Sequence, residues 1–322
     1  MPKKRKFKIK KLFKSKFFKT SIPLYLAISL IINSVAVTGL LEYYFMRKYF
    51  EKQIQKLIQQ NKNPEEFIAE ITRQITPSEG YTTSIKWEDL GQKLIESGAI
   101  DKAKYEEIFN SNTNGKQEMD IFNGNSNKKI SINENNSRFI VNTLWALGLV
   151  NKSKVLSEGV MNTGEYADKT GNFASTGGWT LGAKDSMQLY SSQEIIPFTD
   201  KQQDLVKRIA ENIYRPCCGN HTAFPDCNHG MAALGYIELA VSKGLSEKQI
   251  HKDLLAFNSF WFPQNYVEMA IYFQKEKNIS WDKVDAKLAL SQEYSSAQGA
   301  KKVKQAVQNV PGLQTKGGGC GV

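Results

Sequence analysis

Residues 22–41 read IPLYLAISLIINSVAVTGLL, a stretch of 20 residues without Asp, Glu, Lys or Arg. A helix rises about 1.5 Å per residue, so a helix of this length covers the roughly 30 Å hydrocarbon core of a bilayer. The apolar character continues to Phe45, and Tyr43 and Tyr44 occupy the place of an interfacial aromatic belt. The sequence therefore predicts a single transmembrane helix over residues 22–46.

The charge beside this stretch predicts its orientation. Residues 1–20 contain ten Lys and Arg and no acidic residue, and without them the formal charge of the chain falls from +11 to +1. The positive-inside rule then places residues 1–21 in the cytoplasm, as a basic tail on the anionic inner leaflet, and the main domain outside the cytoplasm. Because the remainder of the chain is nearly neutral, we expect no nucleic-acid partner.

A cleaved signal peptide is the alternative to an uncleaved membrane anchor. Ser34, Val35 and Ala36 fit the small-residue pattern of a cleavage site. The apolar residues continue beyond that site through Leu40 and Leu41, which favours the anchor. Both interpretations send the larger part of the chain to the cell envelope.

Helical patterns dominate the chain after the span. Residues 47–80 are expected to form a juxtamembrane helical stalk, in which Phe50, Ile54 and Ile58 recur every four residues. Such a stripe suits self-association or an envelope protein partner. Residues 81–309 are expected to form a multi-helix extracytoplasmic domain, because no run shows sustained alternation of apolar and polar residues. The predicted class is therefore all-α.

Capping signals place two helices of this domain. Thr199 or Asp200 is expected to begin a helix that runs through Ile213. Ser246 and Gln249 have the spacing of a capping box, which predicts a helix that begins there.

Two segments lack such patterns. Residues 110–137 contain nine Asn and few apolar residues, which predicts a surface loop within the domain. Residues 310–322 form a Gly-rich segment that contains Cys320, and we expect it to be a flexible tail.

A cluster of potential metal ligands stands out in the domain. Five of the seven Cys and His residues of the chain fall within 13 positions, namely Cys217, Cys218, His221, Cys227 and His229. Thiolate and imidazole are the donors that zinc and copper prefer. The spacing matches no zinc finger, zinc ribbon or haem motif, but nearby Pro and Gly favour a tight turn. The first hypothesis is a transition-metal site for zinc or copper, with Asp226 as acceptor for a ligand imidazole N–H.

Two other hypotheses for this loop stay open. Thiols outside the cytoplasm tend to oxidise, and a disulfide between Cys227 and either Cys217 or Cys218 would staple a non-catalytic scaffold or interaction domain. Cys227 also precedes a predicted helix N-terminus, where the helix dipole lowers the pKa of a thiol. Together with His229 it would then serve a thiol-dependent enzyme. Whether the protein is an enzyme stays open at this point.

Three further residues have competing interpretations. Trp179 follows a run of small residues, a pattern that suits a pocket-lining loop, although packing in the core is the more frequent role of a tryptophan. Cys320 is either a further ligand or disulfide partner, or a free thiol in the tail. His251 lies on a predicted helix and is more typical of a surface or core histidine than of a ligand.

The stretch YRPCCGNHTAFPDCNHGMAALG at residues 214–235, with GGWTL before it and NSFWFP after it, resembles an uncharacterised family of bacterial membrane-anchored proteins. The resemblance covers roughly residues 85–300. It implies a bacterial cell-envelope context, and it supplies no activity and no catalytic residue.

Overall fold

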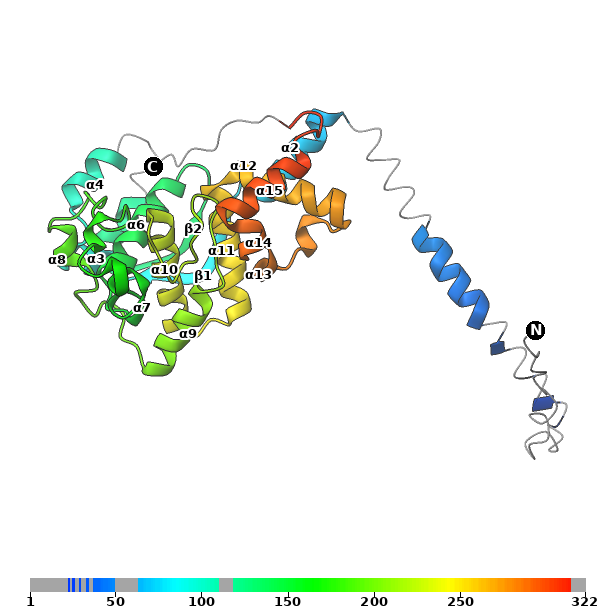
Figure 1. Ribbon diagram of the computed structural model, residues 1–322, viewed down its shortest axis with the longest axis horizontal. Helices are drawn as coiled ribbons and strands as arrows, with labels where there is room; N and C mark the ends of the chain where they lie inside the picture. The colour runs from blue at the N-terminus through cyan, green and yellow to red at the C-terminus, as the bar shows by residue number, and fades with distance from the viewer. Residues whose placement is uncertain are drawn as a thin grey trace, which may run out of the picture. The chain divides into compact units, whose positions relative to one another are not determined.

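The computed structural model describes residues 63–109 and 118–313, and nearer the N-terminus it describes residues 37–49 with residues 23, 25, 26, 29, 33 and 34. The chain divides into two compact units, residues 1–62 and residues 63–322 (Figure 1). Several predicted features lie outside the described residues, namely the basic tail at 1–21, the stalk over 50–62 and Cys320.

The longest continuous described stretch of the first unit is a helix over residues 37–49. Its large apolar side chains are exposed, among them Leu40 at 69% and Phe45 at 66%. Within the described residues, no helix combines the length and the apolar character needed to cross a bilayer. Much of the stretch predicted to span the membrane lies outside those residues, so the transmembrane helix over 22–46 stays a prediction.

The second unit is mostly helical, as expected. Its strands are β1 (Tyr81–Glu88) and β2 (Ser126–Ile132), which pair antiparallel. Its helices are α2 (Pro64–Ile75), α3 (Leu90–Glu96), α4 (Lys102–Phe109), α6 (Ser137–Val150), α7 (Lys154–Ser157), α8 (Ser186–Leu189), α9 (Asp200–Ala210), α10 (Asn228–Ser242), α11 (Glu247–Trp261), α12 (Pro263–Tyr272), α13 (Ala286–Ala289), α14 (Gln292–Ser295) and α15 (Ala297–Val307) (Figure 1).

The pair α6 and α10 forms the centre of the core. Both helices are buried on all sides over nearly their whole length, which is typical of helices in the interior of a domain. They cross at Gly148 and Gly235. A Cβ atom on Gly235 would lie 2.4 Å from the carbonyl oxygen of Leu144, and one on Gly148 would lie 2.1 Å from that of Met231. The crossing therefore requires the absence of a side chain on both helices.

The prediction of an all-α class is wrong for residues 81–88 and 126–132. In β1 the residues Thr83, Ile85 and Trp87 are buried and alternate with exposed or half-buried neighbours. In β2 only Ile130 and Ile132 are buried. One inward position of β1 is a threonine and β2 offers only two apolar positions, so the hydrophobic alternation is too short to recognise in the sequence.

The predicted surface loop at 110–137 is also corrected. Met119–Phe122 forms a 3₁₀ turn with three buried apolar side chains, and β2 follows it. The asparagines that suggested a loop make specific turn contacts. The Asn133 side chain accepts from the backbone N–H of Asn136, a usual role of Asn in turns. Residues 110–117 lie outside the described residues.

The predicted capping signals are confirmed. Thr199, rather than Asp200, caps α9 in a capping box with Gln202. The side chain of Ser246 caps α11 and accepts from the backbone N–H of Gln249. These local contacts fix the N-terminal ends of two helices that border the candidate site and the cavity described below.

A buried carboxyl group lies within α10. Glu238 is fully buried, and its Oε2 accepts a hydrogen bond of 2.9 Å from the Nδ2 of Asn151. Its Oε1 has no hydrogen-bond partner among the described residues. Burial raises the pKa of Glu238 to about 8, because the interior disfavours the charged form.

This raised pKa predicts a loss of stability with rising pH. Between the ordinary pKa of 4.5 and about 8, the folded state holds a proton that the unfolded state has released. The contribution of Glu238 to the free energy of unfolding is therefore fully present below pH 4.5 and falls by up to about 1.4 kcal/mol per pH unit toward pH 8. We expect Glu238→Gln to flatten this slope in urea titrations. The exposed Glu106→Gln is the matched control, and an unchanged slope in Glu238→Gln would contradict the assignment.

Candidate metal centre

The segment between α9 and α10 folds back on itself. Tyr214 and His221 form an isolated antiparallel bridge. Thr222 strengthens the turn, because its backbone N–H and its hydroxyl both donate to the carbonyl oxygen of Ile213, at 2.8 and 2.9 Å. The residues between Tyr214 and His221, which include Pro216, are thus confined to a compact loop. Residues 215–229 form this cysteine loop.

The cysteine loop brings three thiols together. The Sγ atoms of Cys217, Cys218 and Cys227 all lie within 4.8 Å of one another, and those of Cys217 and Cys227 are 3.5 Å apart. All three side chains are partly buried. In a tetrahedral zinc site with Zn–S bonds of about 2.3 Å, the sulfur atoms lie about 3.8 Å apart. The observed spacing therefore fits three thiolate ligands of one ion.

Arg215 is the residue around which the cysteine loop is arranged. Its side chain is fully buried and donates from Nε to the Sγ of Cys227 at 3.0 Å. Nη1 donates to the carbonyl oxygen of Asn220, and Nη2 donates to that of Phe224 and to the carboxylate of Asp226. One guanidinium thus holds the chain on both sides of the turn and contacts a candidate ligand.

The N-terminus of α10 completes this arrangement. Cys227 is the N-cap residue of α10, and the guanidinium of Arg215 lies against the first turn at Gly230. A Cβ atom on Gly230 would lie 2.5 Å from the Cζ of Arg215. A cation at the positive end of a helix is disfavoured unless negative charge lies beside it. The sulfur of Cys227 and the carboxylate of Asp226 provide that charge.

The electrostatic environment distinguishes the thiols. Contacts with the thiols of Cys217 and Cys218, together with the charge of Arg215, hold the pKa of Cys227 well below its ordinary value despite burial. Contacts with its neighbours and burial raise the pKa of Cys217. The contact with the guanidinium of Arg215 therefore favours the thiolate form of Cys227.

The two histidines do not join the three sulfur atoms. No imidazole nitrogen belongs to the group of donors within 4.8 Å that the described residues form. His229 is buried with its ring 4.5 Å from the ring of Phe262, centroid to centroid, and burial lowers its pKa to about 4. The ring of His221 packs edge-on against Tyr214. In each ring Nδ1 is buried and has no hydrogen-bond partner in the described part of the chain.

Two other predicted site residues have structural contacts instead. Asp226 accepts from Arg215 and from the Nδ2 of Asn220, rather than from an imidazole. Trp179 is 4% exposed, packs against Trp145, and donates from Nε1 to the carbonyl oxygen of Ala99. Trp179 is thus a core residue.

His251 is a core histidine, as the sequence favoured. It is buried on α11, and its Nδ1 lies 2.8 Å from the carbonyl oxygen of Glu247. It does not belong to the group of thiols, so it is not part of the candidate metal centre.

Arg215 and Asn220 are the site residues that sequence reasoning missed. A fully buried arginine is rare, so nothing distinguishes Arg215 from a surface arginine before the structure is known. Its position two residues before Cys217 is the one available signal, because a cation close to a thiol stabilises the thiolate.

The cysteine loop also contacts the C-terminal helices. The backbone N–H of Ala297, at the start of α15, donates to the carbonyl oxygen of Cys218 at 2.9 Å. The N–H of Tyr214 donates to the carbonyl oxygen of Leu290 at 2.8 Å. These bonds join the candidate site to a segment about 70–80 residues further along the chain.

No model of a known protein family, no curated protein and no solved structure matches this chain.

Proposed function

We propose that this protein is a membrane-anchored cell-envelope protein whose cysteine loop binds one thiophilic transition-metal ion, zinc or copper, in a structural or metal-handling role. The observation that carries the metal part is the convergence of Cys217, Cys218 and Cys227 within 4.8 Å. Soft thiolate ligands select zinc and monovalent copper over harder ions.

The charges around the thiols support an ion at this place. Three thiolates carry three negative charges, and a divalent ion offsets two of them. Arg215 already donates to Cys227 and lies on the buried side of the loop. The positive charge of Arg215 offsets part of the remaining negative charge of the thiolates, although Arg215 also pairs with the carboxylate of Asp226. Partly buried thiolates without such compensation would be costly, because burial disfavours unpaired charge.

A fourth ligand has two candidates in the loop. Zinc prefers four ligands, and the three thiols leave one position. His221 and His229 each keep a buried Nδ1 without a partner among the described residues, and both follow a ligand cysteine closely in the sequence. Binding through one of them would satisfy a buried nitrogen that otherwise remains unpaired.

The envelope location rests on the sequence. The uncharged stretch at 22–41 and the ten basic residues before it support an anchor with a cytoplasmic N-terminus. In the described helix over residues 37–49 the large apolar side chains are exposed, which agrees with a lipid environment.

Metal analysis of the purified full-length chain tests the proposal. We expect about one zinc or copper ion per chain under reducing conditions, measured by mass spectrometry of the metal content. Cys227→Ser is expected to lose the ion, because it removes the ligand that Arg215 and α10 hold in place. Cys320→Ser, the matched change at the fourth cysteine, is expected to keep it. A reduced, folded chain that binds neither ion contradicts the proposal.

A disulfide-stapled scaffold is the second candidate, favoured by the 3.5 Å distance between the sulfur atoms of Cys217 and Cys227. A bond between them would close a loop of about ten residues and contribute about 2–3 kcal/mol. It predicts that the chain, isolated without reductant, has lost two hydrogen atoms in its intact mass and contains no ion. The metal site predicts reduced cysteines and a bound ion.

The thiol-enzyme hypothesis finds less support. No hydrogen bond joins His229 to Cys227 within the described residues, and the ring of His229 packs against Phe262. The pKa of about 4 keeps His229 neutral at physiological pH, so it would not supply a nearby imidazolium to stabilise the thiolate.

A further inference from the structure

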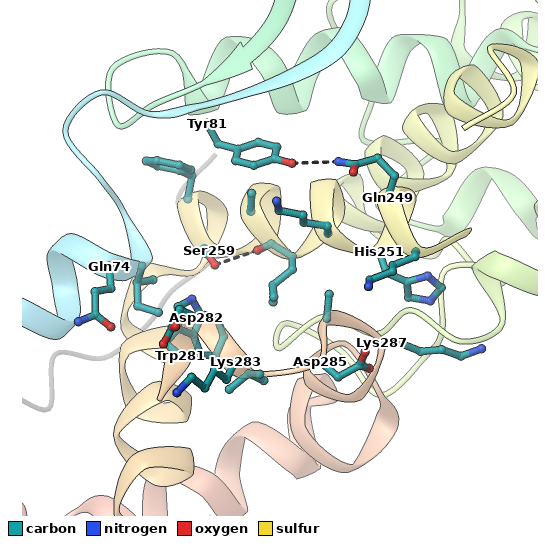
Figure 2. Close-up of a pocket in the computed structure, with 18 of the residues that line it drawn as sticks. Gln74, Tyr81, Gln249, His251, Ser259, Trp281, Asp282, Lys283, Asp285 and Lys287 are labelled. Atoms are coloured by element: carbon teal, nitrogen blue, oxygen red, sulfur yellow. Dashed lines mark hydrogen bonds between the residues drawn. The ribbon is translucent and has the colours of Figure 1, made fainter. Parts of the chain in front are cut away.

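A cavity of about 1010 Å³ lies beside α11. Its floor is α11 from Ser246 to Phe260, and its walls are the turn between α2 and β1 and the segment 281–287. Figure 2 shows Tyr81 and Gln249 on one side of the cavity and Trp281, Asp282 and Lys283 on the opposite side. From Ser246 to Phe260 the floor rises by about 21 Å along the helix axis. A ligand that fills this cavity is therefore elongated.

Positive charge lines the cavity from two directions. Lys248 and Lys252 lie one turn apart on α11, and Lys283 lines the cavity from the segment 281–287. All three are exposed, and none takes part in an ion pair in the described part of the chain. Like charges four residues apart on a helix repel each other. An anion between them would relieve this repulsion.

The acidic groups of the lining are mostly engaged elsewhere. Glu247 accepts from Lys287 at 2.8 Å and from Arg208 at 3.4 Å. The side chain of Asp285 caps α13 by accepting from the backbone N–H of Leu288. Asp282 remains as the one acidic residue of the lining without a contact of this kind among the described residues. Among the described lining residues, three lysines and two aspartates (Asp282 and Asp285) thus form no ion pair, so the unpaired lysines outnumber the unpaired carboxylates.

Apolar and hydrogen-bonding groups accompany the lysines. Leu255 and Phe260 line the floor, and Ile75 and Trp281 line the walls. A hydrocarbon chain would leave the amide of Gln74 and the other polar groups of the lining unsatisfied, whereas a peptide backbone would offer them partners. The lining therefore suits a chain that alternates acidic and apolar side chains.

We propose that this cavity is a docking site for an acidic peptide segment of another protein, which lies along α11 with its carboxylates on Lys248, Lys252 and Lys283 and its apolar side chains against Leu255 and Trp281. This site is separate from the cysteine loop, and its function does not depend on a bound metal ion.

Fluorescence anisotropy with a labelled peptide tests this proposal. The probe is a fluorescein-labelled hexapeptide of alternating glutamate and leucine, titrated with the full-length chain at low salt. We expect saturable binding that weakens as salt is added, because charge pairs at an open surface are screened. The double variant Lys252→Glu/Lys283→Glu is expected to raise the dissociation constant about tenfold or more.

Two controls keep the test decisive. Lys152→Glu/Lys169→Glu makes the same charge change at exposed positions outside the cavity and is expected to bind like the unmodified chain. A hexapeptide of alternating lysine and leucine is expected not to bind. Circular dichroism confirms that each variant is folded. The proposal is overturned if the acidic probe does not bind, or if the two double variants weaken its binding equally.

Discussion

Replacing Arg215 by methionine is expected to lower the free energy of unfolding by about 3–5 kcal/mol, because it removes one partner of a buried ionic network. The carboxylate of Asp226 and the carbonyl oxygens of Asn220 and Phe224 would lose their donor. Methionine fills most of the space but donates no hydrogen bond. Urea unfolding followed by circular dichroism measures the loss. The same variant is expected to bind metal more weakly, since Cys227 loses the contact that holds it.

Two further variants separate the role of Arg215 from general damage. Arg208→Met makes the same change at an arginine whose side chain is 65% exposed, and we expect an effect within about 0.5 kcal/mol. Gly230→Ala keeps the arginine but places a methyl group 2.5 Å from its Cζ, so the guanidinium must move away from α10. If Gly230→Ala leaves both metal binding and stability unchanged, the loop is not arranged around this guanidinium.

Gly235→Ala is expected to destabilise the protein by about 3 kcal/mol through overpacking. The new methyl group would lie 2.4 Å from the carbonyl oxygen of Leu144 and 2.7 Å from the backbone nitrogen of Gly148, so α6 and α10 must move apart. Helix propensity alone predicts the opposite sign, a gain of about 1 kcal/mol for alanine over glycine. A decrease in the free energy of unfolding would therefore show that the close helix crossing controls this position, and an increase would show that helix propensity does. Thermal unfolding should show a midpoint lowered by roughly 10 °C.

Gly219→Ala is the matched control for this experiment. A Cβ atom on Gly219 would meet no atom within 4 Å, so we expect little change in the melting temperature. A stabilised Gly235→Ala variant would show that the two helices have room at the crossing.

The sequence was most informative where the interactions are local. The capping residues Thr199 and Ser246 act on backbone groups three residues away, so their spacing alone predicts two helix starts. The three cysteines lie in one segment of 11 residues, which forms a turn and contains Pro and Gly. A segment this short can bring their side chains together without help from the rest of the fold.

The sequence failed where distant residues decide the outcome. His229 is two residues from Cys227, but its ring packs against Phe262, which lies on a different part of the chain. β1 and β2 are separated in the sequence by α3 and α4, and each becomes a strand because the other supplies its hydrogen bonds. The burial of Arg215 likewise follows from the loop that surrounds it and from Gly230, which no local pattern reveals.

If the cysteine loop binds an ion as proposed, the hydrogen bond from the N–H of Ala297 to the carbonyl oxygen of Cys218 links that binding to the stability of α15. An ion that binds only the folded loop stabilises it by mass action, by about 2.7 kcal/mol at a hundredfold excess over the dissociation constant. Because α15 begins at a residue that this loop holds, resistance of the C-terminal helices to proteolysis should rise with the concentration of free ion. The rate at which a protease releases the last helices would then report the metal supply of the compartment in which the domain resides.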